Sequence, residues 1–321
     1  AGTVVEAGAL TRGPGATLYL NGPDGATKRF RAGNAPAFLK GAGGASGTQT
    51  QSVIPWIGAF ISGNSANPQG FSTCDANGEF RSLADADYAN NLTSGAGSNV
   101  SVSSLALTQS ATVNALRLGY VGTPNIGAGR VLTVASGAVL FQQGARSVGT
   151  SGDAAAGTLD FGAAEGVVWV LGQNVNTIGA VITGSGGLTK TGTGELVLTG
   201  ANTYGGASHV SGGALRVGDG AVSGRLGTGD VTVHTGASLR LSNGGALADG
   251  ATLSVLRQGL FTGRVALERG PLVYGAEGAD HADGVSHVVL PPDAALTPER
   301  RPGLLGGISV LRGTGKALFR D

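Results

Sequence analysis

The sequence predicts an all-β protein: a right-handed parallel β-helix, or β-solenoid, followed by a short β-rich C-terminal segment. The first observation is that 60 of the 321 residues are glycine, against roughly 7% in ordinary proteins, so turns must be very frequent. The second is that short runs rich in Leu and Val recur between these turns. The third is that the hydrophobic period of an amphipathic helix is almost absent.

Several short segments carry the signature of β-strands, because β-branched and aliphatic residues alternate or run together between Gly and Asn turns. In chain order, the predicted strands are 16–20, 131–134, 157–161, 167–171, 195–198, 214–217, 231–233 and 238–241. No β-α-β alternation interrupts them, which favours an all-β chain over an α/β fold.

A recurring pair of units distinguishes the solenoid from other all-β folds. One unit places two small residues before a Leu or Val strand, as in GATL at Gly15, GAVL at Gly137 and GASL at Gly236. The other joins a turn to a strand, as in GTGELVL and GTGDVTV. One pair takes up about twenty residues, the size of a solenoid rung. A β-sandwich would also give short strands, but it would not predict near-identical units in succession.

Composition excludes several functional classes. The formal net charge of +1 and the scattered arginines argue against a nucleic-acid partner. No run of about 18 apolar residues is present, so no transmembrane helix is expected. The single cysteine, Cys74, allows neither an intrachain disulfide nor a multi-cysteine metal site. A cysteine-poor chain rich in Gly, Thr, Ser and Asn favours an exported bacterial protein, found outside the cell or on its surface. The absence of an initiator Met and of a signal-peptide pattern indicates a processed chain.

Residues 186–218 resemble the autotransporter-associated β-strand repeat of bacterial surface proteins. The positions that match the pattern of this repeat are Gly187, Leu188, Lys190, Gly192, Gly194, Leu196, Leu198, Gly200, Asn202, Tyr204 and Gly206. The resemblance extends upstream and covers about residues 1–254, with less regular lead-in rungs to about residue 125. It implies a secreted or surface β-helical passenger, a class usually without known catalytic residues.

Residues from about 258 to 316 resemble a different family, the C-terminal end of bacterial β-L-arabinofuranosidase-type glycoside hydrolases. The matching run is GRVALERGPLVYGAEG, in which Gly275 stands where the family commonly has Cys. That family works through a helical barrel with a cysteine nucleophile and a zinc ion held by further cysteines. The barrel and these cysteines are missing from this chain, so residues 255–321 are expected to be a β-rich segment that caps the last rung.

Few side chains are grouped as catalytic or ligand-binding residues. Asp280, His281, Asp283 and His287 are candidate metal ligands, although the segment also reads as a polar loop. An aromatic cluster offers candidate sugar-binding rings in Trp56, Phe60 and Tyr88, with core packing as the commoner role of such rings. DANGEF at Asp75 begins like a calcium loop but lacks its later ligands, which favours an Asx turn. Glu195 and Asp219 lie about one rung apart in different registers, which favours solvated charges over a catalytic pair.

The sequence therefore predicts an extracellular structural passenger that acts in display, adhesion or self-assembly, without catalysis and without a cofactor. Its expected partners are other copies of the chain, stacked end to end, and a cell-surface glycan or protein. Two alternatives stay open. The chain could be a fragment or accessory carbohydrate-binding part of a glycoside hydrolase, or it could be the subunit of an extracellular filament.

Overall fold

The computed structural model of the chain is a parallel β-solenoid of about nine turns, and 46% of the residues lie in strands. The structure describes residues 3–20, 28–59, 70–103, 107–119, 125–142, 144, 146–149, 156–219 and 221–242, and beyond these the backbone of six strands. Helical structure in these residues is confined to two short 3-10 turns, η1 (Ala35–Phe38) and η2 (Asp85–Asp87). The predicted all-β class and parallel solenoid are thus confirmed.

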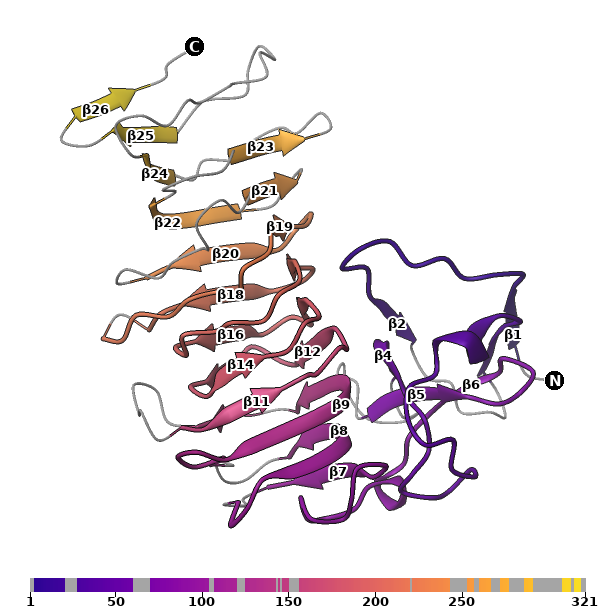
Figure 1. Ribbon diagram of the computed structural model, residues 1–321. Coiled ribbons are helices and arrows are strands. Elements are labelled where there is room, and N and C mark those ends of the chain that lie inside the picture. Colours follow the sequence, from indigo (N-terminus) through magenta and orange to yellow (C-terminus); the bar gives the residue numbers. More distant parts are fainter. Residues whose placement is uncertain are drawn as a thin grey trace.

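Two sheets form the walls of the solenoid, which rises from β7 to β26 in Figure 1. The first contains β7 (Asn99–Val102), β8 (Ala111–Leu118), β9 (Val131–Phe141), β11 (Thr158–Asp160), β12 (Gly166–Val170), β14 (Val181–Thr183), β15 (Leu188–Thr191), β17 (Ser208–Val210), β19 (Val231–Val233), β21 (Leu253–Leu256) and β23 (Leu272–Ala276). The second contains β10 (Ser147–Val148), β13 (Val175–Ile178), β16 (Glu195–Leu198), β18 (Ala214–Val217), β20 (Ser238–Leu241), β22 (Leu260–Ala266), β24 (Ser286–Leu290), β25 (Ile308–Arg312) and β26 (Gly315–Leu318).

The register of the second sheet gives the length of a rung. Val175 of β13 pairs with Glu195 of β16, and Glu195 pairs with Ala214 of β18. Successive rungs are therefore 20 and 19 residues apart (175 to 195 and 195 to 214). Because strands of adjacent rungs run parallel, identical positions of the repeat stack above one another.

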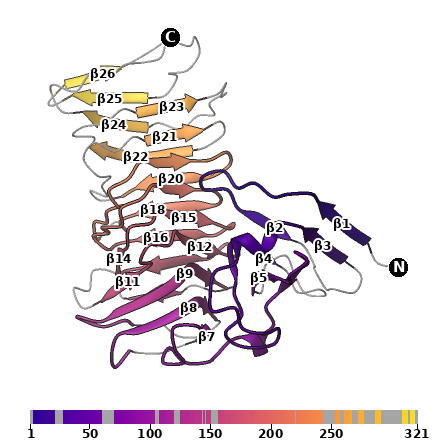
Figure 2. The ribbon, with the colours of Figure 1, turned by 45° about the vertical axis from the view of Figure 1, so that its right-hand side comes forward.

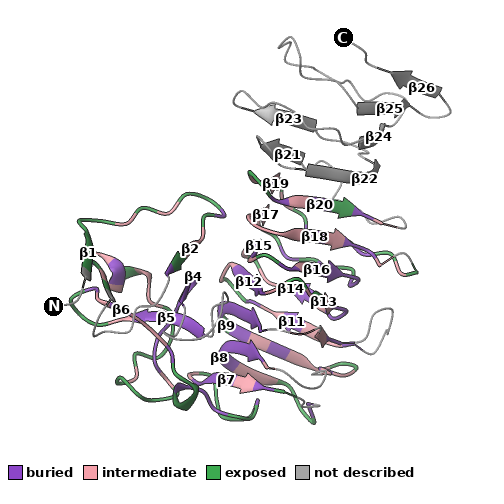
Figure 3. Ribbon diagram, turned by 180° about the vertical axis from the view of Figure 1, so that it is seen from behind, coloured by how far each residue is buried: buried purple, intermediate pink, exposed green. Residues whose placement is uncertain are grey.

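The interior is a column of aliphatic side chains that follows this register. Leu196, Leu215 and Leu239 occupy paired positions in three successive rungs, and each is almost completely buried. Figure 3 shows buried residues interspersed with half-buried and exposed ones along strands of the solenoid such as β20. The stack keeps apolar surface from water in the rungs whose side chains the structure describes, which is the main source of their cohesion.

Strand β9 bends, and the bend gives the early rungs a third side. The first residues of β9 pair with β11, whereas its last residues pair with β12. Gly137 lies at the bend with φ +77°, and a Cβ atom there would come within 1.9 Å of the carbonyl oxygen of Glu165. Only glycine fits this left-handed position without strain.

The first residues of the chain do not form rungs. β1 (Thr3–Ala7) pairs with β3 (Lys28–Ala32), while β2 (Leu18–Leu20), β4 (Ile54–Ala59), β5 (Gly70–Cys74) and β6 (Phe80–Ser82) form a separate sheet. In that sheet β4, β5 and β6 are antiparallel. Figures 1 and 2 show these strands beside the solenoid, against its lower rungs. The expected lead-in rungs therefore begin only at β7, because the short turn at Asp75–Gly78 returns the chain antiparallel.

An apolar patch on the outside of the solenoid explains why these sheets pack there. Val167, Trp169 and Leu171 alternate along β12 and just after it, on the side opposite the interior, and all three are buried. They form one hydrophobic cluster with Val53, Phe71, Leu83 and Tyr88 of the N-terminal part. The Nε1 of Trp169 also donates a hydrogen bond to the carbonyl oxygen of Pro55 at 2.8 Å. Trp169 is therefore a core residue, but it lies between the two parts and not inside the solenoid.

The C-terminal strands continue the ladders of the solenoid. β22 pairs in parallel with β20, β24 with β22, and β25 with β24. The final strand, β26, pairs antiparallel with β25 and so ends the parallel order. A capping role for residues 255–321, and a domain boundary near residue 254, stay predictions.

Candidate functional site

One pocket of about 470 Å³ opens between the N-terminal sheet and the loop that follows η1. Polar groups of both charge signs line it, with apolar walls from Leu39 and Phe80. The remaining lining residues are Gly43, Gly44, Ser46, Gln51, Ser52, Thr73, Cys74, Asp75, Glu79 and Arg81. A pocket of this composition can hydrogen-bond a neutral polar molecule, since both donors and acceptors face it.

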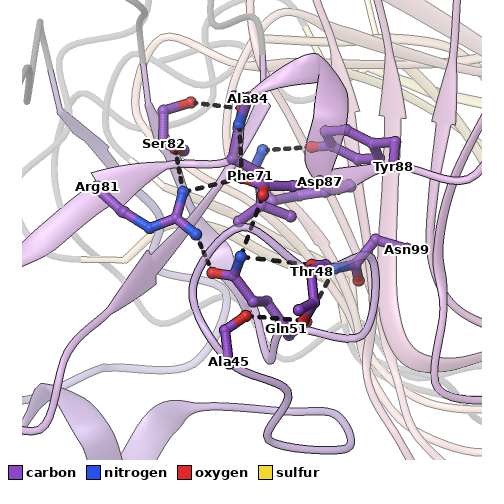
Figure 4. Close-up of polar contacts among 11 residues, drawn as sticks. Ala45, Thr48, Gln51, Phe71, Arg81, Ser82, Ala84, Asp87, Tyr88 and Asn99 are labelled. Carbon is purple, nitrogen blue, oxygen red and sulfur yellow. Dashed lines mark hydrogen bonds and ion pairs between the residues drawn. The ribbon is translucent and has the colours of Figure 1, made fainter.

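A buried polar network holds the inner wall of the pocket, as Figure 4 shows. The carboxylate of Asp87 accepts hydrogen bonds from Arg81 Nη1 at 2.9 Å and from Gln51 Nε2 at 3.1 Å. The same carboxylate accepts the backbone N–H of Ala84 at 2.9 Å, which anchors the turn η2. Arg81 also donates to the side-chain oxygen of Gln51. Asp87 is only 2% exposed, and these hydrogen bonds compensate for the hydration that its carboxylate loses on burial.

The outer rim of the pocket is the turn between β5 and β6. Asp75 Oδ1 accepts the backbone N–H groups of Asn77 and Glu79, both at 2.9 Å, which is the predicted Asx turn. The hydrogen bond from the Glu79 backbone holds the pKa of Asp75 below its ordinary value. Glu79 itself pairs with Arg29. Burial raises the pKa of the neighbouring Cys74 thiol to about 11, so this thiol is protonated and unreactive at neutral pH.

The repeat residues build a second polar centre inside the solenoid. Lys190 of β15 is fully buried, and its Nζ donates to the carbonyl oxygens of Gly192 at 2.9 Å, Gly212 at 2.7 Å and Gly194. Burial lowers the pKa of Lys190 to about 7, against an opposing influence from Glu195. The ammonium thus closes the corner between two rungs by satisfying three carbonyl groups.

Two further repeat residues connect rungs. Asn202 accepts the backbone N–H of Ile182 and donates to the carbonyl oxygen of Arg225, each within 2.8 Å. Tyr204 is buried at a corner, and its hydroxyl lies 2.6 Å from Ser208 Oγ. These polar contacts are structural in character, since every partner belongs to the solenoid itself.

The candidate sugar-binding rings lie differently from an exposed platform. Trp56 is 7% exposed, with Phe38 edge-on at 5.2 Å and the guanidinium of Arg12 above its ring. Tyr88 is 5% exposed, its hydroxyl accepts the backbone N–H of Phe71, and Arg117 covers its ring. Phe60 lies outside the described residues. Stacking of a sugar on Trp56 or Tyr88 would require their present neighbours to move.

The candidate metal ligands cannot be placed. Asp280, His281 and Asp283 lie outside the described residues, and of His287 only the backbone position in β24 is given. Within the part of the chain that the structure describes, His, Cys, Asp and Glu side chains form no group of three that could hold a metal ion. Glu195 and Asp219 do not meet: Glu195 pairs with Arg216 at 2.8 Å, and Asp219 accepts the backbone N–H groups of Ala221 and Val222.

Sequence patterns did not reveal a third polar cluster, on the outer face of the first sheet. Arg12 forms a bidentate ion pair with Glu165, 153 residues away, with Nη–Oε distances of 2.5 and 2.9 Å. Next to this pair, Nδ1 of His209 lies 3.2 Å from Nε2 of His234. Only the 25-residue spacing of the two histidines, close to one rung, offered a sequence signal for part of this cluster.

The geometry defines the class of protein first: a parallel β-solenoid with accessory β-sheets packed on one side. Two known families then match parts of the chain. Residues 188–217, from β15 to β18, match the Passenger-associated-transport-repeat family, and residues 260–309 match the Glycoside hydrolase family 127 C-terminal domain. Both matches agree with the resemblances seen in the sequence. The repeat match indicates a secreted or cell-surface protein. No curated protein and no solved structure matches the chain significantly.

No helix in the described residues has the length and apolar character needed to cross a membrane.

Proposed function

We propose that this chain is a passenger of a bacterial surface protein, and that its solenoid serves as a rigid scaffold for display and adhesion outside the cell. The observation that carries this proposal is the passenger-repeat match at residues 188–217 within an unbroken ladder of rungs. Parallel ladders satisfy the backbone along the whole stack, and the aliphatic column resists bending. The outward side chains and the N-terminal sheets are then free to present contacts.

An export experiment tests the proposal. The chain is placed between a signal peptide and an autotransporter translocator in a Gram-negative host, and surface exposure is read by antibody binding and protease shaving of intact cells. We expect exposed, protease-resistant solenoid rungs. The matched control, Leu196→Asp, places a charge in the aliphatic column and should abolish that resistance. Wild-type chain that folds in isolation yet is never displayed would refute the proposal.

A second candidate rests on a separate observation, the match of residues 260–309 to a glycoside hydrolase C-terminal domain. In this alternative the chain is an accessory carbohydrate-binding part of such an enzyme, and the pocket beside β5 and β6 is where a sugar would bind. Calorimetric titration with arabinofuranosides, together with zinc analysis and turnover assays, distinguishes the two. Saturable binding that Gln51→Ala removes would favour the carbohydrate role, whereas stoichiometric zinc with turnover would make the chain an enzyme.

Self-association is a further proposal within the passenger role, because stacked strands at an uncovered end can pair with another copy. Electron microscopy of the purified chain across a concentration series is the direct measurement. Filaments would make assembly the main function, and monodisperse short rods would remove it.

A further inference from the structure

Residues 9–17, which we call the N-terminal strap, cross the outer face of β15 and β17. The strap is held there by polar contacts. Thr17 Oγ1 lies 2.9 Å from Thr191 Oγ1, and Ser211 Oγ donates to the carbonyl oxygen of Gly15 at 2.6 Å. Arg12 of the strap makes the bidentate ion pair with Glu165, whose carboxylate also accepts the hydroxyl of Thr189.

The outward side chains beneath the strap form a row across adjacent rungs, which we call the polar ladder. It consists of Glu165, Thr189, Thr191, His209 and Ser211. Thr189 pairs directly with His209 in the register of β15 and β17. The strap therefore shields a hydroxyl-, carboxylate- and imidazole-bearing surface of the solenoid from solvent.

The backbone of the strap rests on an imidazole ring. Gly15 has φ +68°, and a Cβ atom at this position would come within 2.5 Å of both Cβ and Cγ of His209. This close approach means that His209 cannot change its position or hydration without disturbing the strap.

His209 does not face the strap alone. Nδ1 of His209 lies 3.2 Å from Nε2 of His234, so one neutral ring can donate to the other, whereas two protonated rings would repel. Arg12 of the strap adds a further positive charge near His209. Among the described groups that act on His209, Glu165 supplies the only negative charge. The pKa of His209 lies below its ordinary value, mainly because the ring is buried and then because His234 and Arg12 add positive charge, while Glu165 opposes this shift. Burial also lowers the pKa of His234.

Leu10 of the strap packs against the N-terminal core, and Arg12 lies over the ring of Trp56, so these contacts hold the strap to the N-terminal part and not to the solenoid. Gly15 is its only buried residue, and the others are half-buried or exposed. The hydrophobic cluster around Trp169, in contrast, lies between the solenoid and later parts of the N-terminal sheets. Repulsion between the two protonated histidines can therefore outweigh the contacts that hold the strap, while the N-terminal sheets stay packed on the solenoid.

We propose that the N-terminal strap is an acid-released cover, which protonation of His209 and His234 lifts from the polar ladder while the contacts of Trp169 keep the N-terminal sheets docked. The sign follows from linkage. A histidine whose pKa is lower in the docked state binds fewer protons there, so docking weakens as the pH falls through the ordinary histidine value of about 6.5. Each unit by which docking lowers a histidine pKa changes the docking equilibrium about tenfold. The released surface would be open at the pH of acidic environments and covered at neutral pH.

Hydrogen exchange with mass spectrometry on the full chain tests this. The readout is protection of the peptide that contains residues 9–17, corrected for intrinsic rates, at about pH 7.5 and about pH 5.5. We expect a roughly tenfold or greater loss of protection on acidification, with the protection of the peptide that contains β4 (Ile54–Ala59) unchanged. In H209Q/H234Q the ratio between the two pH values should approach one. The ratio of protection at the two pH values is the deciding quantity, because a substitution that loosens the strap equally at both pH values leaves this ratio unchanged.

A covalent lock provides the matched control. In a C74S background, T17C/T191C places two thiols where two hydroxyls lie 2.9 Å apart. The oxidised form should lose the acid response, and reduction should restore it. The proposal is overturned if the wild-type peptide shows no pH dependence, if H209Q/H234Q retains the full response, or if β4 loses protection together with the strap. The last result would show separation of the whole N-terminal part.

Discussion

At the scale of single residues, two buried charges show how this chain tolerates ions away from water. Asp87 lies behind the pocket and is satisfied by an arginine, a glutamine and a backbone N–H. Lys190 lies inside the solenoid and is satisfied by carbonyl groups alone. Removal of a buried charge leaves its partners unpaired, so each site should be sensitive even to substitutions that preserve volume.

Asp87→Asn should destabilise the chain by about 2 kcal/mol, because an amide N–H₂ would face the donors of Arg81 and Gln51. Urea unfolding at neutral pH measures the loss. Glu6→Gln is the control: Glu6 pairs with Arg31, but the two side chains are 63% and 46% exposed, so no measurable change is expected. Equal effects at the two positions would show that burial does not set the cost.

Lys190 should make the stability of the solenoid depend on pH. Its pKa is about 7 in the fold and 10.5 unfolded, so the unfolded chain binds more protons between these values. Stability should therefore rise with pH by up to about 1.4 kcal/mol per unit from about pH 7.5 to 9.5, relative to Lys190→Met. The window ends there because Lys190 begins to lose its proton in the unfolded chain as the pH approaches 10.5, so the slope falls.

Urea titrations of wild type and Lys190→Met across this range measure the difference. Parallel curves would mean that Lys190 keeps its proton in the fold, held by the carbonyls of Gly192, Gly194 and Gly212.

At the scale of elements, strand β9 shows how one glycine shapes a rung. The strand serves two neighbours, β11 and β12, and so has to turn within its own length. Gly137 permits this turn because its φ is positive and the carbonyl of Glu165 occupies the space of a side chain. The GAVL unit in the sequence is thus a corner followed by a strand.

Gly137→Ala should cost roughly 2–4 kcal/mol, since both the backbone conformation and the contact with Glu165 would be strained. Gly129→Ala separates the two effects. Gly129 also has a positive φ, +68°, but no atom lies within 4 Å of the added Cβ, so a cost of only about 1 kcal/mol is expected. Thermal unfolding of both variants measures the two losses of stability. Similar losses would show that the positive φ alone, and not the contact with Glu165, causes the cost.

At the scale of the whole molecule, an outward apolar strand decides where the N-terminal sheets pack. β12 directs Val167 and Trp169 to one side and Val168 and Val170 to the other, and all four are buried, so both of its sides are covered. A strand that is buried on both sides has a continuous run of apolar residues, and VVWVL in and just after β12 is such a run.

Trp169→Ala should loosen this contact by roughly 3–5 kcal/mol, because a large ring and its hydrogen bond to Pro55 are lost. Limited proteolysis should then cut within β2–β6 while rungs between residues 156 and 242 stay protected. Trp56→Phe, inside the N-terminal core, should leave the cleavage pattern unchanged. Cleavage spread evenly over both parts would contradict a separable interface.

The rungs between residues 188 and 217 could be predicted because their information is local and repeated. Leu196, Leu198 and Leu215 recur at strand spacing, and all three lie in the interior. The pocket wall could not be predicted in this way. Gln51, Arg81 and Asp87 are single polar residues from separate segments, and no period links them. The aromatic cluster was visible, but its rings could fill a core or face a ligand, and only burial of Trp56 and Tyr88 distinguishes the two.

The all-β class, the length of a rung and the aliphatic column follow from the amino-acid sequence alone, because parallel strands repeat the same local requirement in every turn. The same sequence also contains the two family resemblances. Three features emerge only in the folded chain: the first strands form sheets beside the solenoid, Trp169 joins the two parts, and the strap lies on His209. The placement of the N-terminal part on the solenoid depends on contacts between residues more than a hundred positions apart, such as Arg12 with Glu165, and a single long-range pair leaves no pattern along the chain.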